Sequence, residues 1–169
     1  LFVDLDHFKM VNDGCGHSAG DRLLQQIAAM LRESVRASDT VARMGGDEFA
    51  ILLVQCPQPA AAALAQRICD RLENFRFTVD DRRFPVGASI GLAPVGGVLD
   101  SVETVMQAAD ECCYAAKEAG RNRVVAWPVK PTSSPAAQGA ARWAERIGRA
   151  LDENRFVLFG QLVLPLHSQ

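Results

Sequence analysis

Two adjacent glycines followed by two acidic residues, Gly45-Gly46-Asp47-Glu48, stand between two apolar runs of the chain. Val41 to Arg43 precedes them, Phe49 to Val54 follows them, and both runs have the composition of strands. Glycine readily adopts the positive φ of a tight turn and lets a ligand approach the backbone. The pattern therefore predicts a β-hairpin over residues 40–54 with two carboxylates at its tip.

Paired carboxylates at a tight hairpin tip can bind a divalent cation or activate a hydroxyl group. A solvated hairpin with acidic turn residues is the simpler interpretation of the same letters taken alone. The rest of the chain has to separate these two interpretations.

The bulk composition indicates a folded domain and disfavours two classes of partner. Of the 169 residues, 49% are hydrophobic and 22% charged, which is enough for a packed core. A net charge of −2 gives no electrostatic case for binding nucleic acid or an anionic membrane. No apolar run reaches the roughly 18 residues that span a bilayer. We expect no nucleic-acid partner and no membrane contact for this part of the protein.

The chain contains five cysteines and no CxxC spacing. Their odd number, and the helical patterns around Cys69, Cys112 and Cys113, disfavour a disulfide framework or a zinc site. We interpret them as reduced thiols that serve as small apolar side chains, as in the cytoplasm. The chain lacks an initiator methionine and opens within a strand pattern. We therefore expect it to be a fragment of a longer protein, whose membrane attachment elsewhere is left open.

Hydrophobic periodicity predicts alternating strands and helices with the hairpin in the middle. The predicted elements, in chain order, are a strand over 1–5, a polar stretch over 6–20 with a turn at Asn12-Asp13-Gly14, a helix over 21–36, the hairpin, a helix over 57–75, strands over 77–79 and 84–95 joined by a turn at Asp80-Asp81, a helix over 102–119 and a strand over 124–127. This order predicts an α/β (α+β) fold with a central mixed β-sheet flanked by helices.

The composition changes after residue 127. Three prolines stiffen a linker over residues 128–139. A helical pattern over 140–154 and a strand pattern over 155–166 follow, and about 30 residues are too few to build a separate core. We expect residues 140–169 to be the start of a second, truncated domain.

Asp4 stands at the end of the first predicted strand. Next to a hairpin that carries Asp47 and Glu48, it can complete a divalent-cation site. Magnesium prefers one or two carboxylates together with waters and substrate phosphates. The sequence offers no complete set of protein ligands for a metal ion, which suggests that the metal arrives with a nucleotide. Solvation of a strand-end aspartate is the alternative for Asp4 alone.

Asn12 and Asp21 fit recognition of guanine. A carboxylate can accept hydrogen bonds from guanine N1–H and from its 2-amino group, whereas adenine has neither group. An unmatched buried polar group costs about 1–3 kcal/mol, so such a site discriminates strongly. Backbone N–H groups of residues 8–13 and 16–21 can cradle phosphates. Helix N-capping is the alternative for Asp21, and a structural role is the simpler interpretation of His17.

Lys117 and Arg121 flank the end of the helix predicted over 102–119. Cations at this position complement the negative end of the helix dipole. The functional interpretation is that they neutralise the phosphates of a nucleotide.

Taken together, the chain resembles the GGDEF family, the diguanylate cyclases, from Leu1 to about Trp127. The matching segments are Asp4-Leu5-Asp6-His7-Phe8-Lys9, Asn12-Asp13, Gly16-His17, Gly20-Asp21, Gly45-Gly46-Asp47-Glu48-Phe49, Ser89-Ile90-Gly91, and Asp110 through Tyr114-Ala115-Ala116-Lys117 to Gly120-Arg121-Asn122. The resemblance implies a nucleotide-cyclase-like palm fold. It also implies condensation of two GTP molecules into cyclic di-GMP with release of two pyrophosphates. Because each domain would hold one GTP, it further implies a homodimer through the active-site face.

The resemblance assigns catalytic roles by position. Asp4 and Asp47 correspond to the carboxylate ligands of Mg²⁺ (or Mn²⁺), with the Leu5 carbonyl as a further ligand. Asp47 also corresponds to the general base that deprotonates the attacking ribose 3′-hydroxyl, assisted by Glu48. Phosphoryl transfer depends mostly on positioning and charge neutralisation, which agrees with such a set of residues.

The resemblance assigns substrate binding to a second set of residues. Asn12 and Asp21 would recognise guanine, and Phe8 would also line the substrate site. Lys9, Lys117 and Arg121 would stabilise charge on the phosphates.

Arg36 and Asp39 match the family's RxxD inhibitory site, at the expected position upstream of the hairpin. Arginine can hold a phosphate or a guanine edge, and aspartate can pair with guanine N–H groups. We therefore expect the product, cyclic di-GMP, to bind there and to limit activity.

The tail resembles the start of an EAL phosphodiesterase domain, from Arg142 to Gln161. The EAL catalytic residues are not in this chain, so we expect no hydrolase activity from it. The family's preceding helix and loop, with an Asp-x-Leu-Thr-Gly-Leu-x-Asn-Arg pattern, are also not in this chain, and we expect the fragment to be weakly active. A GTP- or cyclic di-GMP-sensing module that controls the EAL domain without turnover is the alternative function.

Overall fold

A computed structural model describes residues 1–96, 99 and 101–127 of the chain. The predicted linker over 128–139, and the helix and strand predicted beyond it, lie outside the described residues.

A five-stranded sheet is the centre of the described part, and its strand order is β2-β3-β1-β6-β7. The strands are β1 (Phe2–Asp6), β2 (Thr40–Gly45), β3 (Glu48–Leu52), β6 (Gly87–Leu92) and β7 (Arg123–Ala126). The middle strand β1 pairs antiparallel with both β3 and β6, while β6 and β7 run parallel. The predicted mixed sheet is therefore confirmed.

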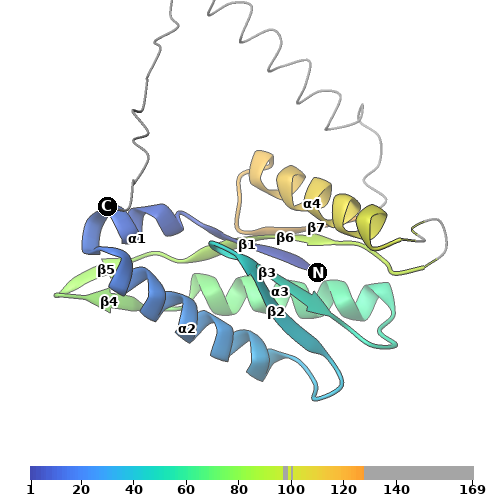
Figure 1. The fold of residues 1–169 in the computed structure, drawn as a ribbon, viewed down its shortest axis with the longest axis horizontal. Helices are drawn as coiled ribbons and strands as arrows, with labels where there is room; N and C mark the ends of the chain where they lie inside the picture. Colours follow the sequence, from blue (N-terminus) through green and yellow to red (C-terminus); the bar gives the residue numbers. More distant parts are fainter. Residues whose placement is uncertain (97–98, 100, 128–169) are drawn as a thin grey trace, which may run out of the picture. The chain divides into compact units, whose positions relative to one another are not determined.

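Helices cover both faces of this sheet (Figure 1). The helices are α1 (Phe8–Cys15), α2 (His17–Ser34), α3 (Gln58–Glu73) and α4 (Val102–Glu118). Figure 1 shows α4 on one side of the sheet and α2 and α3 on the other. Strands β4 (Phe77–Val79) and β5 (Arg82–Phe84) form a separate two-stranded ribbon. The predicted α+β architecture is confirmed.

Strand β1 is buried along its whole length, and its side chains alternate between two environments. Val3 and Leu5 belong to the main core, which the residues of α2 and α3 also fill. Phe2 instead packs with Ala109 and Cys113 of α4. Because side chains alternate along a strand, Asp4 and Asp6 share the α4 side with Phe2. The strand thus sends its apolar residues into the main core and its acidic residues toward α4.

Helix α4 lies unusually close to β6. A Cβ at Gly91 would collide with the carbonyl oxygen of Ala109 and lie 2.6 Å from the backbone nitrogen of Cys113. A capping box fixes the start of the helix: the Ser101 hydroxyl accepts the Thr104 N–H at 3.1 Å, and the Thr104 hydroxyl accepts the Ser101 N–H at 3.1 Å. The close approach at Gly91 and the capping box at Ser101 together determine the position of the last turn of α4.

Two predicted turns are confirmed. The hairpin over residues 40–54 turns between β2 and β3, and Gly46 at its tip has φ +50°. Asp80 and Asp81 join β4 to β5 with positive φ at both residues, which is typical of the tight turns that match strand twist.

The turn predicted at Asn12-Asp13-Gly14 is wrong, since these residues form the end of α1. The left-handed residue that ends the helix is Gly16, at φ +79°, two positions further along. Helix α2 likewise begins at His17 and not at Asp21. Local turn propensity is overridden because α1 packs against α2 across Gly20, where a Cβ would collide with the Asn12 side chain.

Two further predictions need correction. The strand predicted over 84–95 is divided into β5 and β6, because Pro85 lies between them and cannot donate a backbone hydrogen bond. The apolar spacing of the helix over 102–119 predicts that Val102, Ala109, Cys113 and Ala116 face inward. Val102 is instead 74% exposed, since it begins α4 beyond the edge of the core. The other three residues are buried, as this spacing predicts.

Three of the cysteines act as buried apolar side chains, as predicted. Cys69, Cys112 and Cys113 are buried free thiols. Burial raises the thiol pKa to about 12 for Cys69 and Cys113 and to about 11 for Cys112. Among the described helices, none has the length and apolar character needed to cross a bilayer.

The close approach at Gly91 leads to a test of packing. Gly91→Ala would force α4 away from β6, and we expect the free energy of unfolding to fall by about 3 kcal/mol, the upper end of usual overpacking costs. Gly45→Ala is the matched control, because a Cβ there meets nothing within 4 Å. Urea unfolding of both variants measures the difference. Equal stabilities would contradict the packing described for α4.

Candidate active site

The end of β1 and the hairpin tip meet side by side. Asp4 lies directly opposite Glu48 in the β1–β3 register. The Leu5 N–H donates to the Asp47 carbonyl at 3.2 Å, which ties the turn to the strand. The Arg43 guanidinium closes the turn from its other side by donating to the Gly46 carbonyl at 3.0 Å. Residues far apart in the sequence, Asp4, Leu5, Asp47 and Glu48, are thus brought together.

Lys117 reaches this acidic group from the last turn of α4. Its ammonium donates to the Asp4 carboxylate at 2.6 Å. The Asp4 side chain is 11% exposed and the Lys117 side chain 33%, so the ion pair lies at the edge of the core. The close packing of α4 on β6 carries Lys117 to this position.

Burial and charge repulsion perturb the carboxylates of the site. Burial raises the pKa of Asp4, the hydrogen bond and charge of Lys117 partly offset this, and the charges of Asp47 and Asp6 add to it. Burial likewise raises the pKa of Glu48, reinforced by Asp4 and Asp47. Burial alone would lower the pKa of Lys117. The hydrogen bond and the charge of Asp4 outweigh burial, so the pKa of the Lys117 ammonium group is raised. The site is therefore a crowded acidic group that favours a bound cation.

Asp6 holds a second, more deeply buried network that the sequence reasoning did not assign. Its carboxylate accepts the Ser89 hydroxyl at 2.9 Å and the Asn122 N–H at 3.0 Å. The Arg121 guanidinium lies 3.9 Å from the same group. Arg121 and Asn122 both have positive φ, at 61° and 46°. The only sequence signal for this network was the spacing of Asp4 and Asp6, which puts both on one face of β1.

Asp6 thereby holds the segment after α4 in a strained conformation. Non-glycine residues at positive φ cost on the order of 1–3 kcal/mol each and persist where their surroundings fix them. The constraint leaves the Arg121 side chain 51% exposed at the rim of the site.

The helices that follow β1 present the residues predicted to contact substrate. Phe8 and Lys9 form the first turn of α1, whose N-terminus has no side-chain cap. Open N–H groups at a helix N-terminus attract anions. The Asn12 carboxamide lies against Gly20 of α2, directly before Asp21. The structure therefore places the Asn12 side chain next to the backbone of Gly20, the residue that precedes Asp21.

One expectation about this region is wrong. Residues 16–21 form no open phosphate-binding turn, because the Ala19 and Gly20 N–H groups donate to the Gly16 carbonyl inside the first turn of α2. Asp21 lies within α2 and is not its N-cap, so the capping interpretation also fails.

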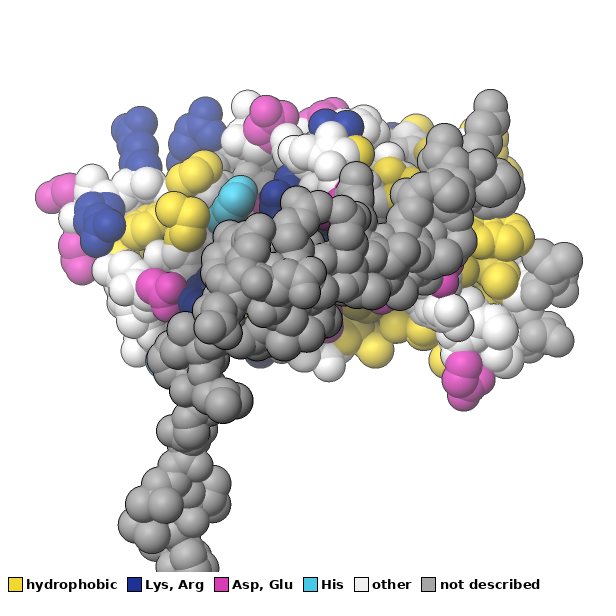
Figure 2. All heavy atoms as spheres, turned by 90° about the horizontal axis from the view of Figure 1, so that it is seen from above, with side chains coloured by type: hydrophobic (Ala, Val, Ile, Leu, Met, Phe, Trp, Pro, Cys, Tyr) yellow, Lys and Arg dark blue, Asp and Glu magenta, His cyan; other side chains and the backbone are white. Residues whose placement is uncertain are grey.

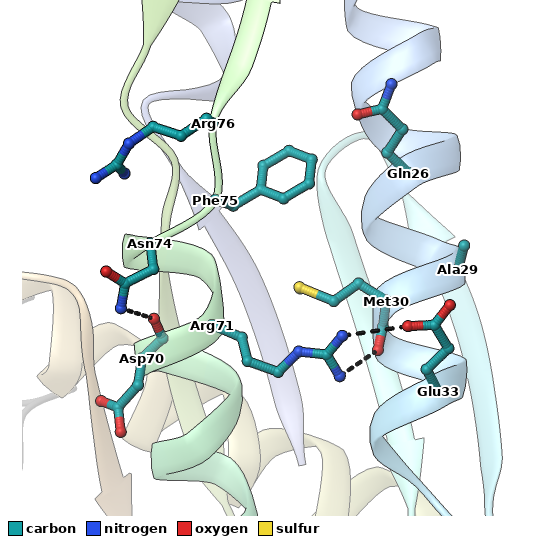
Figure 3. A pocket seen from close by; sticks show the side chains of 9 residues that line it. All are labelled: Gln26, Ala29, Met30, Glu33, Asp70, Arg71, Asn74, Phe75 and Arg76. Carbon is teal, nitrogen blue, oxygen red and sulfur yellow. Dashed lines mark hydrogen bonds and ion pairs between the residues drawn. The ribbon is translucent and has the colours of Figure 1, made fainter.

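A cavity of about 410 Å³ lies between α2 and the hairpin, on the same side as Asp21. Asp21, Arg32, Arg43 and Phe49 are among its lining residues. A larger cavity of about 750 Å³ lies elsewhere, between α2 and the C-terminal end of α3 (Figure 3). Arg71 spans that cavity to Glu33 at 3.2 Å, and none of the predicted site residues lines it.

Positive side chains gather beside α1. Figure 2 shows Lys and Arg side chains at its left end, on the side where Figure 1 places α1 and the β4–β5 ribbon. Exposed Lys9, Arg82 and Arg83 belong to these elements. Lys9 lies in the first turn of α1, whereas Arg82 donates to the Gly14 carbonyl at the other end of this helix.

The residues around Asp4 fit a divalent cation that arrives with other ligands. Within residues 1–96, 99 and 101–127, no three His, Cys, Asp or Glu side chains are grouped as a ready-made metal site. Asp47 is close enough for its charge to raise the pKa of Asp4, and the Lys117 ammonium already occupies a cation position on Asp4. Two carboxylates with open positions suit Mg²⁺ held together with waters and phosphates.

Arg36 and Asp39 lie in the turn between α2 and β2. The Asp39 carboxylate accepts the Arg36 N–H at 3.0 Å and the Val54 N–H at 3.1 Å. Asp39 thus fastens the turn to the end of the hairpin. The backbone hydrogen bonds from Val54 and Arg36 lower the pKa of Asp39.

A mixed sheet with acidic groups at a strand end and a hairpin tip, faced by a cation from α4, defines a GGDEF cyclase-like domain. Residues 1–123 match the family described as diguanylate cyclase, GGDEF domain. The chain therefore belongs to the GGDEF diguanylate cyclase family.

Individual relatives agree with this assignment. The chain is 39% identical over 169 residues to "Probable diguanylate cyclase DgcE" of Escherichia coli, covering 99% of this chain and 15% of that protein. It is 32% identical over 165 residues to "Cyclic di-GMP phosphodiesterase PdeB" of Shewanella oneidensis, covering 98% of this chain and 19% of that protein. The chain thus spans less than a fifth of either relative.

A solved structure has the same fold. The GGDEF domain of DgcB from Caulobacter crescentus, in complex with c-di-GMP, superposes with a TM-score of 0.70 at 30% identity. The match covers 74% of this chain and 74% of that one.

The contacts of Asp39 predict a pH-dependent contribution to stability. A lowered folded-state pKa stabilises the fold above the unfolded-state value of about 3.9, and this contribution is lost as the pH falls through the folded-state pKa. We expect Asp39→Ala to have a lower urea midpoint than wild type at pH 7 and the difference to shrink below about pH 4.

Asp13→Ala is the control for this experiment. Asp13 is exposed on α1, and its side chain makes no hydrogen bond recorded within the described part of the chain. Its effect on the urea midpoint should stay small between pH 3 and pH 7. An Asp39→Ala deficit that does not change with pH would contradict the assigned contacts.

Proposed function

We propose that this domain condenses two GTP molecules into cyclic di-GMP and pyrophosphate as a diguanylate cyclase. The observation that carries the proposal is the convergence of Asp4, Asp47 and Glu48 with Lys117, directly before the uncapped N-terminus of α1. Phosphoryl transfer requires positioning and charge neutralisation more than covalent chemistry by the protein, and this arrangement can supply both.

Guanine recognition is assigned to Asn12 and Asp21. The Asp21 carboxylate would accept from guanine N1–H and the 2-amino group, while the Asn12 carboxamide can both donate and accept. The Asn12 side chain lies against Gly20, the residue before Asp21. Adenine would leave the carboxylate unpaired, which gives the expected preference for GTP.

The triphosphate is assigned to the first turn of α1 and to three cations. Open N–H groups at Phe8 and Lys9 would bind phosphate oxygens, and the side chains of Lys9, Lys117 and Arg121 would neutralise their charge. Arg121 is preoriented by Asp6 and 51% exposed, which leaves its guanidinium accessible to a ligand.

The chemical step is assigned to the hairpin tip. Asp4, Asp47 and the Leu5 carbonyl would hold Mg²⁺ or Mn²⁺, which when bound stabilises charge on the reacting phosphate. Asp47 would accept the proton of the ribose 3′-hydroxyl as its oxygen attacks the α-phosphorus of the second GTP and pyrophosphate leaves, with Glu48 assisting. Because each domain binds one GTP, two copies must face each other through this site, and a monomer is inactive.

Product control is assigned to Arg36 and Asp39. The Arg36 side chain is exposed, and its guanidinium can bind a phosphate or guanine edge of cyclic di-GMP. The solved GGDEF domain of DgcB is a complex with c-di-GMP, which supports binding of this product by the family. Since both Asp39 oxygens already bind backbone N–H groups, Arg36 is the residue expected to carry most of the affinity.

Residues 140–169 are assigned to the start of an EAL domain in a tandem cytoplasmic protein. The similarity to PdeB, a relative named as a phosphodiesterase, extends past residue 127 and supports this part of the proposal. A tandem arrangement also favours the second candidate function, in which this domain binds GTP or cyclic di-GMP and regulates its neighbour without turnover.

The full-length protein, incubated with GTP and Mg²⁺, tests the choice between enzyme and regulator. We expect cyclic di-GMP to form and Asp47→Asn to lower the initial rate by about 10²-fold or more, as loss of a general base does. Chromatography of the products measures both. GTP binding without product from wild type would overturn the cyclase proposal in favour of the regulator.

Arg36→Ala provides the matched control in the same assay. It should keep the initial rate, because Arg36 lies in the turn before β2 and away from the acidic group. Its progress curve should stay linear where the wild-type curve bends as product accumulates. A bend equal to that of wild type would exclude Arg36 from the product site.

A further inference from the structure

The contact between Lys117 and Asp4 is the shortest charged interaction recorded within the described part of the chain, at 2.6 Å. Asp4 is also the carboxylate assigned to the metal, and Lys117 is assigned to the phosphates. In the structure these two residues bind each other.

We propose that Lys117 is the resident counter-cation of Asp4 in the nucleotide-free protein and has to leave Asp4 before a divalent metal ion can bind. The phosphates of the incoming nucleotide then take over the Lys117 ammonium. This inference rests on the proposed function and concerns the order in which the same site is filled.

The surroundings of Asp4 explain why a resident cation is needed. Asp4 is 8% exposed, and the charges of Asp47 and Asp6 both act against its ionised form. A buried carboxylate without a counter-charge is unstable, so it either takes up a proton or pairs with a cation. Lys117, whose ammonium lies 2.6 Å from Asp4, supplies that counter-charge.

The same contact disfavours a second cation on Asp4. The Lys117 ammonium lies 2.6 Å from Asp4 Oδ2, so this oxygen is already engaged and is not free to bind a metal ion. Two positive charges on one carboxylate repel each other, so the metal and Lys117 compete. Metal affinity without nucleotide is therefore reduced by the free energy of the Asp4–Lys117 pair.

Lys117 is suited to exchange partners. It is 33% exposed on a flexible side chain, so its ammonium can swing toward solvent or phosphate. Arg121 has Asp6 as its partner, and Lys9 has no ion pair recorded within residues 1–96, 99 and 101–127. Metal and nucleotide binding are thus linked: phosphates that attract Lys117 free Asp4, and a metal on Asp4 frees Lys117 for phosphates.

Mn²⁺ binding to the 169-residue chain without nucleotide tests this competition. Calorimetric titration of wild type and Lys117→Met at pH 7 measures the two affinities. We expect Lys117→Met to bind Mn²⁺ about tenfold more tightly or better, because close charge pairs couple by at least that factor. Equal or weaker Mn²⁺ binding by Lys117→Met would overturn the proposal.

Three further variants keep the result interpretable. Lys117→Arg retains a cation for Asp4 and should keep the weak wild-type affinity. Lys9→Met removes the same charge from α1 and should also leave Mn²⁺ affinity unchanged; a gain equal to that of Lys117→Met would show a general charge effect and overturn the proposal. Adding Asp4→Asn to Lys117→Met should abolish the gain, and its persistence would also overturn it.

The test is separate from that of the cyclase proposal. It uses neither GTP nor turnover, so a protein that makes no cyclic di-GMP can still show the Lys117→Met gain. Conversely, an active cyclase in which Lys117→Met leaves Mn²⁺ affinity unchanged would retain the proposed function and lose this inference.

Discussion

The antiparallel pairing of β1 with β3 on one side and β6 on the other determines both the core and the position of the acidic side chains. It buries β1 completely, and the alternation of a strand then sends Val3 and Leu5 into the main core and Asp4 and Asp6 to the α4 side. The same pairing puts Glu48 opposite Asp4 from one neighbour and Ser89 opposite Asp4 from the other. A one-residue slip of the register would turn the acidic residues into the core, so the packing of the core fixes the geometry of the site.

The second requirement is a cation for the acidic side of β1, and α4 provides it. The helix can approach β6 closely because residue 91 is glycine and its contacts on the helix are Ala109 and Cys113. This approach carries Lys117 to Asp4, and the segment after the helix is held by Asp6. The proposed chemistry therefore depends on the packing of α4 on β6, because this packing places Lys117 next to Asp4.

The sequence predicted most of the elements, since strong periodicity and clear turn residues agree with the fold at the hairpin, at Asp80-Asp81 and in the long helices. It failed at Asn12-Asp13-Gly14, where contact between α1 and α2 across Gly20 outweighs local turn propensity. Motif positions were enough to nominate Asp4, Asp47 and Lys117. They were not enough to predict that Lys117 binds Asp4 or that Asp6 organises the residues after α4, because such contacts between α4 and β1 depend on packing that no local pattern encodes.

We propose that this domain binds a guanine nucleotide between α1, α2 and the hairpin tip. Calorimetric titration of the chain with non-hydrolysable GTP and ATP analogues in Mg²⁺ measures its base preference. We expect the guanine analogue to bind at least about a hundredfold more tightly than the adenine analogue, and Asp21→Ala to remove this preference. Equal affinity for both analogues in wild type, or an unchanged preference in Asp21→Ala, would contradict it.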